Sequence, residues 1–253
     1  MPGTLYVIGV GPGDPELLTL KAARVLREVT CICVPKGREE GSSLALSIVK
    51  KAVDLDGKEI IEAYFPMRKT TKQKPAHRSR STEKEGSGSA SCELDAKWNE
   101  TAETVMSILA GGIDMAFITI GDPTIYSTFF YLYDRLLELN PGLAVEIIPG
   151  VSSINASAAR AEISLGLADE KVAIVPATYA DSLKGVLEAF DTVVLMKVHK
   201  VLDRIIQALD VARLTEKAVY ISRAGMSDER IIRNIREVKE SDLNYFSIVI
   251  VRK

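Results

Sequence analysis

Three short turns carry the residues whose types and spacing suggest ligand chemistry. Each turn combines glycine and proline with Asp or Ser and follows an apolar run, at residues 9–15, 120–126 and 148–153. Glycine tolerates unusual backbone angles, and Asp and Ser side chains offer hydrogen-bonding groups. Any one of these turns alone is explained as a plain connection, such as Ser152 capping a helix. Three turns of the same kind indicate a site for a polar small molecule.

The side chains that usually perform acid–base or nucleophilic chemistry are scarce. His77 and His199 are the only two histidines, and neither has a metal-ligating partner at useful spacing. The chain has no Gly-x-Ser-x-Gly elbow and no His-Glu-x-x-His motif. We therefore expect no metal site and no classical hydrolase.

The first turn resembles a dinucleotide-binding loop but fails on detail. Gly9 and Gly11 fit the Gly-x-Gly-x-x-Gly pattern, but Asp14 stands where the third glycine belongs. The strand that ends at Val34-Pro-Lys36 also lacks the acidic residue expected about 20 residues on. A carboxylate beside a pyrophosphate would repel it, so the turn argues against nicotinamide binding.

The elements that must position these turns alternate between strand and helix. Met115–Ile120 is an apolar run interrupted only by Thr119, typical of a strand buried on both faces, so Gly121–Thr124 lies at its carboxyl end, where open α/β sheets bind ligands. Helical spacing resumes at Ile125. Further strands are predicted at 5–10, 30–35, 59–63, 143–148, 171–176, 192–196, 217–222 and 247–251, and further helices at 17–26, 42–53, 96–109, 183–190 and 201–209. The pattern predicts two α/β domains, 1–121 and 122–253.

Composition excludes several classes of protein. The 253 residues are 47% hydrophobic and 26% charged, which is ordinary for a globular protein, and the net charge of −2 gives no reason to expect nucleic acid. No apolar run reaches the roughly 18 residues that a membrane helix needs. The first residues read as a strand rather than a signal peptide, and Cys31 and Cys33 read as buried reduced thiols. We expect a cytoplasmic protein.

Residues 68–95 differ in kind from the rest of the chain. They contain almost no large apolar side chains. Residues 68–85 include seven basic and two acidic residues, which gives that stretch a charge of +5. Such a segment cannot bury enough apolar surface to order itself, so it is predicted to be a mobile basic insertion. Its role is either that of a tolerated surface insertion or of an electrostatic attractor for an anionic substrate.

In their order and spacing, the three turns resemble those of the tetrapyrrole (corrin/porphyrin) methyltransferases, which use S-adenosylmethionine. The resemblance covers nearly the whole chain except 68–95. Four segments are similar to the branch that methylates C-20 of precorrin-2 or cobalt-factor II in cobalamin biosynthesis: 15–22, 65–67, 122–128 and 149–155. The family fold is two α/β domains with the ligand cleft between them, and it is not the Rossmann methyltransferase fold.

The resemblance also implies the site residues. Those implied to contact S-adenosylmethionine, which leaves as S-adenosylhomocysteine, are Pro12, Ile120, Gly121, Asp122, Ile125, Ser152, Ser153, Met196 and Ala224. Those implied to face the tetrapyrrole substrate are Gly11, Gly13 and Asp14. The base that removes the C-20 proton is not identified, and Asp14 and Tyr126 are candidates. The competing roles for these two residues are a helix-terminal acid and a packed aromatic side chain.

The implied chemistry suits a chain with few acid–base residues, because a sulfonium methyl group is already an activated electrophile. The resemblance further implies a homodimer, and the net charge and the lack of a long apolar run give no reason to expect nucleic acid or a membrane as a partner. Three different functions stay open: another ring methyltransferase of corrin or siroheme synthesis, a nicotinamide-dependent dehydrogenase, and a non-catalytic ligand-binding module.

Overall fold

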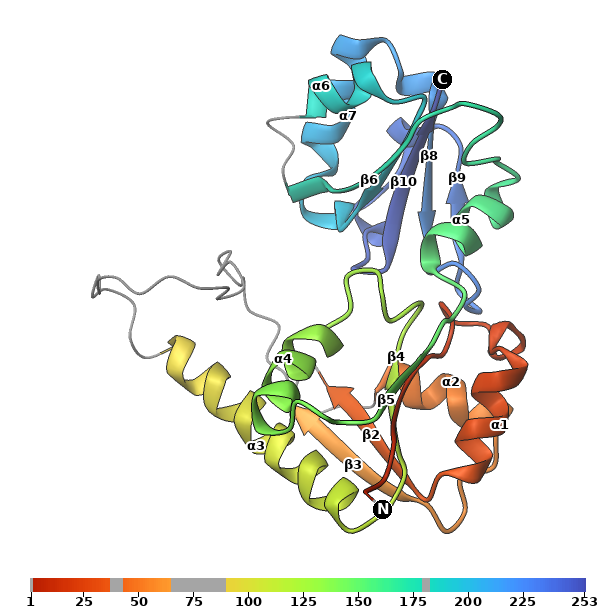
Figure 1. The fold of residues 1–253 in the computed structure, drawn as a ribbon. Helices are drawn as coiled ribbons and strands as arrows, with labels where there is room; N and C mark the ends of the chain where they lie inside the picture. The colour runs from red at the N-terminus through yellow and green to blue at the C-terminus, as the bar shows by residue number, and fades with distance from the viewer. Residues whose placement is uncertain (1, 37–42, 65–89, 179–182) are drawn as a thin grey trace, which may run out of the picture. The chain divides into compact units, whose positions relative to one another are not determined.

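A computed structural model describes residues 2–36, 43–64, 90–178 and 183–253 (Figure 1). The chain divides into two compact units. The first comprises Met1–Val10 and Leu18–Gly150, and the second comprises Gly11–Leu17 and Val151–Lys253. This division differs from the boundary expected at 121/122, because the helix and strand that follow Gly121 belong to the first unit.

The first unit is built on a parallel sheet with the strand order β3-β2-β4-β1-β5. Its strands are β1 (Leu5–Gly9), β2 (Cys31–Lys36), β3 (Glu59–Tyr64), β4 (Met115–Thr119) and β5 (Val145–Ile148). Every residue of the central strand β4 is buried, as its apolar run predicts, and this includes the polar Thr119 at its end. The carboxyl ends of β1, β4 and β5 therefore meet at one edge of the sheet.

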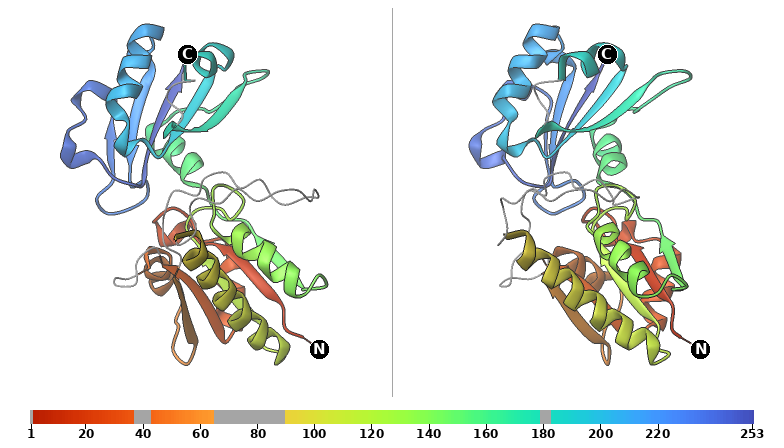
Figure 2. Two further views of the ribbon diagram at one scale, coloured as in Figure 1. Left: turned by 90° about the vertical axis from the view of Figure 1, so that its left-hand side faces the viewer. Right: turned by 60° about the vertical axis from the view of Figure 1, so that its left-hand side comes forward.

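Four α-helices cover the two faces of this sheet. Figures 1 and 2 show α3 (Ala90–Ala110) and α4 (Phe129–Leu139) on one face, and α1 (Leu20–Glu28) and α2 (Leu44–Ala52) on the other. Each face has its own buried apolar cluster. Side-chain oxygens of Thr19 and Ser43 accept hydrogen bonds from backbone N–H groups in the first turns of α1 and α2.

Helix α4 begins later than its spacing predicts. The sequence places the helix from Ile125 onward, but α4 starts at Phe129. Asp122 and Pro123 open an irregular turn, and Tyr126 adopts a φ of 54°, a left-handed conformation that no α-helix contains. Ser127, two residues before the helix, accepts a hydrogen bond from the Phe129 N–H at 3.1 Å, and Thr128 is the N-cap residue.

Most of the basic segment predicted at 68–95 lies outside the described residues, as do Phe65–Met67 and His77. Its last six residues do not fit the prediction of a mobile insertion, because α3 begins at Ala90 rather than at Ala96.

The second unit contains a mixed sheet with the order β6-β7-β10-β8-β9, in which only the β6–β7 pair is parallel. Its strands are β6 (Val172–Pro176), β7 (Thr192–Met196), β8 (Ala218–Ser222), β9 (Arg230–Ile232) and β10 (Ser247–Arg252). Helices α6 (Leu183–Ala189) and α7 (Leu202–Ala212) pack on one face, and α5 (Ser153–Ala161) contacts β8 and β10 on the other (Figure 1). Short 3₁₀ turns occupy 15–17, 198–200, 215–217, 235–237 and 240–242.

The buried thiols are as expected. Cys31 and Cys33 are free and buried, and burial raises their pKa values to about 11 and about 12.

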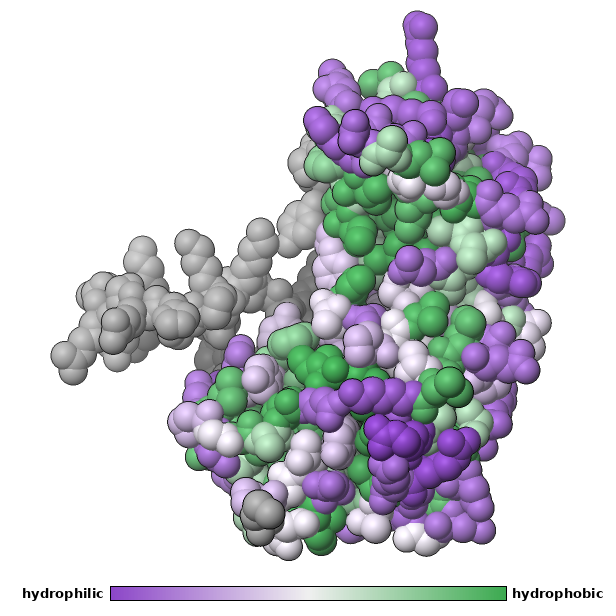
Figure 3. Space-filling model, turned by 45° about the vertical axis from the view of Figure 1, so that its right-hand side comes forward, coloured by the Kyte–Doolittle hydropathy of each residue, from purple (hydrophilic) through white to green (hydrophobic). Residues whose placement is uncertain are grey.

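Within the described part of the chain, no helix is long and apolar enough to cross a membrane. The same residues hold no group of three or more potential metal ligands. On the face drawn in Figure 3, polar and apolar side chains are interspersed.

Candidate functional site

The first group of predicted site residues lies at the carboxyl edge of the parallel sheet. Strands β4 and β5 flank β1, so the turns that follow these strands converge. They begin at Gly9, Ile120 and Pro149. A ligand at this edge would meet backbone groups from three segments that are far apart in the sequence.

Glycine is required where these turns touch. A Cβ atom on Gly9 would lie 2.6 Å from the Gly121 carbonyl oxygen and 2.7 Å from the Gly150 nitrogen. A Cβ atom on Gly150 would lie 2.7 Å from the Gly9 carbonyl group. Gly121 has a φ of 72°, which favours glycine on conformational grounds. The three glycines thus allow the turns to pack backbone against backbone.

The carboxylate of Asp122 joins two of these turns. Its Oδ1 accepts hydrogen bonds from the Thr124 N–H, at 2.8 Å, and from the Thr124 hydroxyl. Its Oδ2 accepts a hydrogen bond from the Gly150 N–H at 3.0 Å. The side chain therefore holds the shape of this edge. Thr124, which the sequence does not single out as a site residue, fixes the orientation of the carboxylate.

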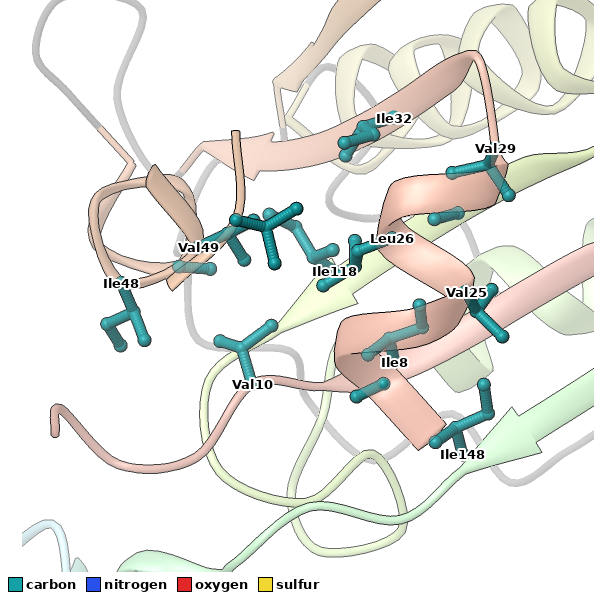
Figure 4. Packing of buried hydrophobic residues seen from close by; sticks show 14 of the residues in the cluster. Ile8, Val10, Val25, Leu26, Val29, Ile32, Ile48, Val49, Ile118 and Ile148 are labelled. Atoms are coloured by element: carbon teal, nitrogen blue, oxygen red, sulfur yellow. The ribbon is translucent and has the colours of Figure 1, made fainter. Parts of the chain in front are cut away.

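The turns rest on the apolar cluster between the sheet and helices α1 and α2. Figure 4 shows Ile8, Val10, Ile118 and Ile148 in one packed group with side chains from both helices. All four are at most 1% exposed, although they stand within three residues of the turns. Close packing directly beneath the edge leaves the turn backbone little freedom to move.

Three other predicted residues occupy the turn that leads into α4. Ile120 and Ile125 are half-buried, and Tyr126 is 48% exposed. Tyr126 is also one of few residues other than glycine with positive φ. Such a conformation costs energy for a large side chain and recurs at functional sites.

The second group of predicted residues lies in the second unit and includes the segment 11–17. Gly13 and Gly225 face each other, because a Cβ atom on Gly13 would lie 3.2 Å from the Gly225 carbonyl group. Gly225 has a φ of 78°, and its Cβ would lie 3.2 Å from the Asp14 nitrogen and 3.8 Å from Pro12. The structure thus brings together two segments that are far apart in the sequence, 11–14 and 222–225.

Ser152 has a clear local role. Its Oγ accepts a hydrogen bond from the Asn155 N–H at 3.3 Å and donates one to the Asn155 side chain at 2.9 Å. It is the N-cap of α5, and Ser153 is the first residue of that helix. Met196 ends β7 and is half-buried. Ala224 is buried in the loop after β8.

Asp14 also has a local partner. Its Oδ1 accepts a hydrogen bond from the Glu16 N–H at 2.9 Å, and its carbonyl accepts one from the Leu17 N–H at 3.1 Å. Both bonds stabilise the short 3₁₀ turn Pro15–Leu17. The helix-terminal role that competes with a catalytic one for Asp14 is therefore present.

His199, the second of the two histidines, lies beside an aromatic side chain. Its ring lies 5.7 Å from that of Tyr245, and its Nδ1 atom is buried without a hydrogen-bond partner among the described residues. Burial and, secondarily, Lys200 lower the pKa of His199, so the ring is neutral at pH 7.

Nearly the whole chain matches one family of known proteins. The family described as Tetrapyrrole (Corrin/Porphyrin) Methylases matches residues 4–239. The chain belongs to this family. The resemblance read from the three turns is thereby confirmed, and with it the two α/β units of the tetrapyrrole methylase type.

Relatives of the tetrapyrrole methylase family match this chain over almost its full length. The cobalt-precorrin-2 C(20)-methyltransferase of Salmonella typhimurium is 34% identical over 100% of this chain and 98% of its own length. A probable enzyme of the same name from Methanocaldococcus jannaschii is 36% identical, over 98% of this chain and 96% of its own. The precorrin-2 C(20)-methyltransferase of a Sinorhizobium species is 30% identical, over 98% and 95%.

Solved structures show the same fold at low identity. A cobalt precorrin-4 methyltransferase aligns with a TM-score of 0.69 and 20% identity, covering 98% of this chain and 94% of its own. Uroporphyrin-III C-methyltransferase from Thermus thermophilus, in complex with S-adenosylhomocysteine, aligns with a TM-score of 0.63 and 20% identity, covering 99% and 92%.

Proposed function

We propose that this tetrapyrrole methylase transfers a methyl group from S-adenosylmethionine to C-20 of precorrin-2 or of its cobalt-containing counterpart cobalt-factor II, in cobalamin biosynthesis. The observation that carries the proposal is the similarity, at 30–36% identity over at least 98% of the chain, to three proteins named as C(20)-methyltransferases of precorrin-2 or cobalt-precorrin-2. Metal, where present, belongs to the substrate ring.

The glycine-lined turns fit a cofactor of this kind. S-adenosylmethionine, when bound, supplies a methyl group already activated on sulfur. In the first unit the contacts assigned to the cofactor are Ile120, Gly121, Asp122 and Ile125, which follow β4 at the sheet edge where Gly9 and Gly150 pack against the Gly121 carbonyl. In the second unit the contacts assigned to the cofactor are Pro12, Ser152, Ser153, Met196 and Ala224. Gly11, Gly13 and Asp14 are assigned to the substrate.

The protein's main contribution is then positional. A precorrin meso carbon is an electron-rich, enamine-like nucleophile, so neither reactant needs a strong acid or base to activate it. Holding two reactants in line can supply about 7–11 kcal/mol in well-oriented systems. The close-packed edge formed by Gly9, Gly121 and Gly150 suits this task, since its backbone is fixed before any ligand binds.

Proton removal from C-20 is assigned to either Asp14 or Tyr126. Asp14 uses one carboxylate oxygen to accept the Glu16 N–H. Tyr126 exposes almost half of its side chain from a strained backbone. Comparing Asp14→Asn with Tyr126→Phe in single-turnover experiments separates the candidates, because only loss of the true base should slow loss of the C-20 proton from the methylated ring at saturating cofactor and substrate.

We further propose a cytoplasmic homodimer. The family resemblance supports the dimer, and so does edge strand β6, which exposes Val172 by 39% and Ile174 by 41%. Exposed apolar residues on an edge strand favour association with another chain. Sedimentation at micromolar concentration tests the proposal, and a monomer would contradict it.

The deciding experiment is a paired methylation assay with metal-free precorrin-2 and cobalt-factor II, read by mass and by NMR of the methylated carbon. Methylation at another carbon would move the protein to a different branch of the family. Calorimetry with S-adenosylhomocysteine and with NAD distinguishes this methyltransferase from a dehydrogenase and from a non-catalytic module. Binding of NAD alone would favour a dehydrogenase, and thioether binding without turnover of any tetrapyrrole would favour a non-catalytic module.

A further inference from the structure

The loop between β8 and β9, residues 223–229, holds a carboxylate that no part of the proposed chemistry uses. Oε2 of Glu229 accepts a hydrogen bond from the Gly225 N–H at 2.7 Å. The side chain of Glu229 is only 11% exposed. Gly225 follows Ala224, one of the residues assigned to the cofactor, so Glu229 fixes the backbone at that position.

Arg160 holds the same carboxylate through its guanidinium group. Its Nε donates to Oε1 of Glu229 at 2.8 Å and to Oε2 at 3.0 Å, and its Nη2 lies 2.7 Å from Oε1. Arg160 stands in the last turn of α5, whose N-cap is Ser152. The ion pair thus joins two elements that carry residues assigned to the cofactor.

The position of Gly225 also determines where the segment 12–14 packs. The backbone of Asp14 and the ring of Pro12 lie within 4 Å of the place where a Gly225 Cβ would be. A shift of Gly225 would therefore displace the Ala224 contact and the Pro12–Asp14 turn together. Arg223 has a φ of 56°, which costs energy for a residue other than glycine, so the loop keeps this shape only while its surroundings hold it.

We propose that Glu229, fixed by Arg160, is a positioning residue that sets the geometry of Ala224 and Gly225 for binding the S-adenosyl cofactor. The inference rests on the proposed function, because it takes the cofactor to bind at these turns. Glu229 acts through the loop backbone and makes no contact with the reacting atoms.

A carboxylate suits this position better than its amide analogue. Glu229 accepts bonds from a backbone N–H and from a guanidinium, and both are donors. A glutamine offers one oxygen acceptor and one NH₂ donor, so one of the two partners would face a donor. Glu229→Gln should therefore weaken cofactor binding, and Glu229→Ala should weaken it further.

The chain offers a matched control in Glu170. Its carboxylate also accepts a backbone N–H, that of Leu167 at 2.8 Å, and pairs with Arg252 at 2.8 and 3.1 Å. It lies in the second unit, in a segment with no residue assigned to the cofactor. Glu170→Ala removes the same kinds of interaction and should leave cofactor affinity unchanged.

The test is titration calorimetry of the full chain and its variants with S-adenosylhomocysteine, together with steady-state kinetics. Loss of a charge-assisted hydrogen bond should weaken binding in Glu229→Ala about tenfold or more. The KM for S-adenosylmethionine should rise in parallel, with kcat at saturating cofactor little changed. If Glu229→Ala fails to fold, Glu229→Gln is measured in the same way.

The outcomes separate the two proposals. If the unaltered protein does not bind S-adenosylhomocysteine, the proposed function fails. If it binds and the folded Glu229 variants bind equally well, the positioning role is overturned. An equal loss of affinity in Glu170→Ala would also overturn it, because the effect would then reflect general weakening of the second unit.

Discussion

The two groups of turns are held by different interactions. In the first unit, Gly9, Gly121 and Gly150 pack backbone against backbone over a fully buried apolar cluster. In the second unit, the loop at Gly225 is held by two side chains, Glu229 and Arg160, and Arg160 is 61% exposed. Backbone packing leaves no room for adjustment, whereas a side-chain clamp can be weakened without rebuilding the fold. Substitutions in the first group should therefore cost stability, and those in the second should cost affinity.

The largest expected effect is from Gly9→Ala. The new methyl group would lie 2.6–2.8 Å from the Gly121 carbonyl, the Gly150 nitrogen and the Pro123 ring. Backbone atoms cannot move aside cheaply, so the free energy of unfolding should fall by about 3 kcal/mol. Urea denaturation monitored by circular dichroism measures it.

Gly185→Ala is the control for Gly9→Ala. Gly185 stands in α6, and a Cβ there would meet nothing within 4 Å. Alanine is the better helix former by about 1 kcal/mol, so stability should be unchanged or raised. If both variants unfolded alike, the close packing of the first group would not be the cause.

Asp122→Ala should have the next largest effect. The carboxylate accepts hydrogen bonds from Thr124 and Gly150, and its loss leaves the half-buried Gly150 N–H without its acceptor. A cost of about 1–3 kcal/mol in the free energy of unfolding is expected, along with weaker S-adenosylhomocysteine binding by the folded protein. Asp122→Asn, which keeps one acceptor oxygen, should lose less of both. Unchanged stability and affinity in Asp122→Ala would refute the linking role.

Gly13→Ala is the counterpart of Gly9→Ala in the second unit. Its Cβ would lie 2.5 Å from Cγ of Met226 and 3.2 Å from Gly225. The methionine side chain is flexible and can move, so the stability loss should stay below about 1 kcal/mol. Cofactor affinity should still fall, because the segment 12–14 shifts against Gly225. A stability loss as large as that of Gly9→Ala would remove the contrast between the two units.

The smallest effect concerns the thiols in the core of the first unit. Burial raises the pKa of Cys31 to about 11 and that of Cys33 to about 12, against about 8.5 for a free thiol. Both thiols stay neutral and unreactive at pH 8 while the unit is folded. Their contribution to stability is present below pH 8.5 and declines as pH rises toward 11, because only the unfolded chain then ionises.

The chain has a third cysteine, Cys92, which is removed in the test by Cys92→Ser. Thiol modification of this variant at pH 8 measures the reactivity of Cys31 and Cys33. No thiol should react until denaturant is added, and prompt reaction in the native state would contradict the burial. Cys33→Ala in the same background should leave one thiol, still protected.

Much of the fold was predictable, because buried parallel strands read as unbroken apolar runs. The strands predicted at 115–120 and 5–10 agree to within one residue with β4 (Met115–Thr119) and β1 (Leu5–Gly9). Strand β9 is missed because it has three residues and begins with an exposed Arg230. The start of α4 is misplaced because Ile125 fits helical spacing by chance, while the left-handed Tyr126 interrupts the helix. The spacing of apolar residues gives no information about the backbone angles of one residue such as Tyr126.

The arrangement of the candidate site was predictable only in part. Glycine-rich turns have a recognisable sequence, so both groups of turns are found. Glu229 carries no such signal, because its partner Arg160 lies 69 residues away and only the folded chain brings them together. The division into two compact units could not be read from the sequence for a related reason. Residues 11–17 group with a unit whose other residues begin far along the chain, at Val151.

The grouping of Gly11–Leu17 with the second unit has a consequence for synthesis on the ribosome. Strand β1 and helix α1 emerge early and belong to the first unit, but the turn between them has its partners at Gly225 and Met226. At about 5–20 residues per second, the ribosome needs roughly 10–40 s to reach those partners. During that interval the first unit can form its sheet while the turn waits undocked. If residues 1–150 and 151–253 were expressed separately, the turn Gly11–Leu17 would likewise be on the first fragment, while its partners would be on the second.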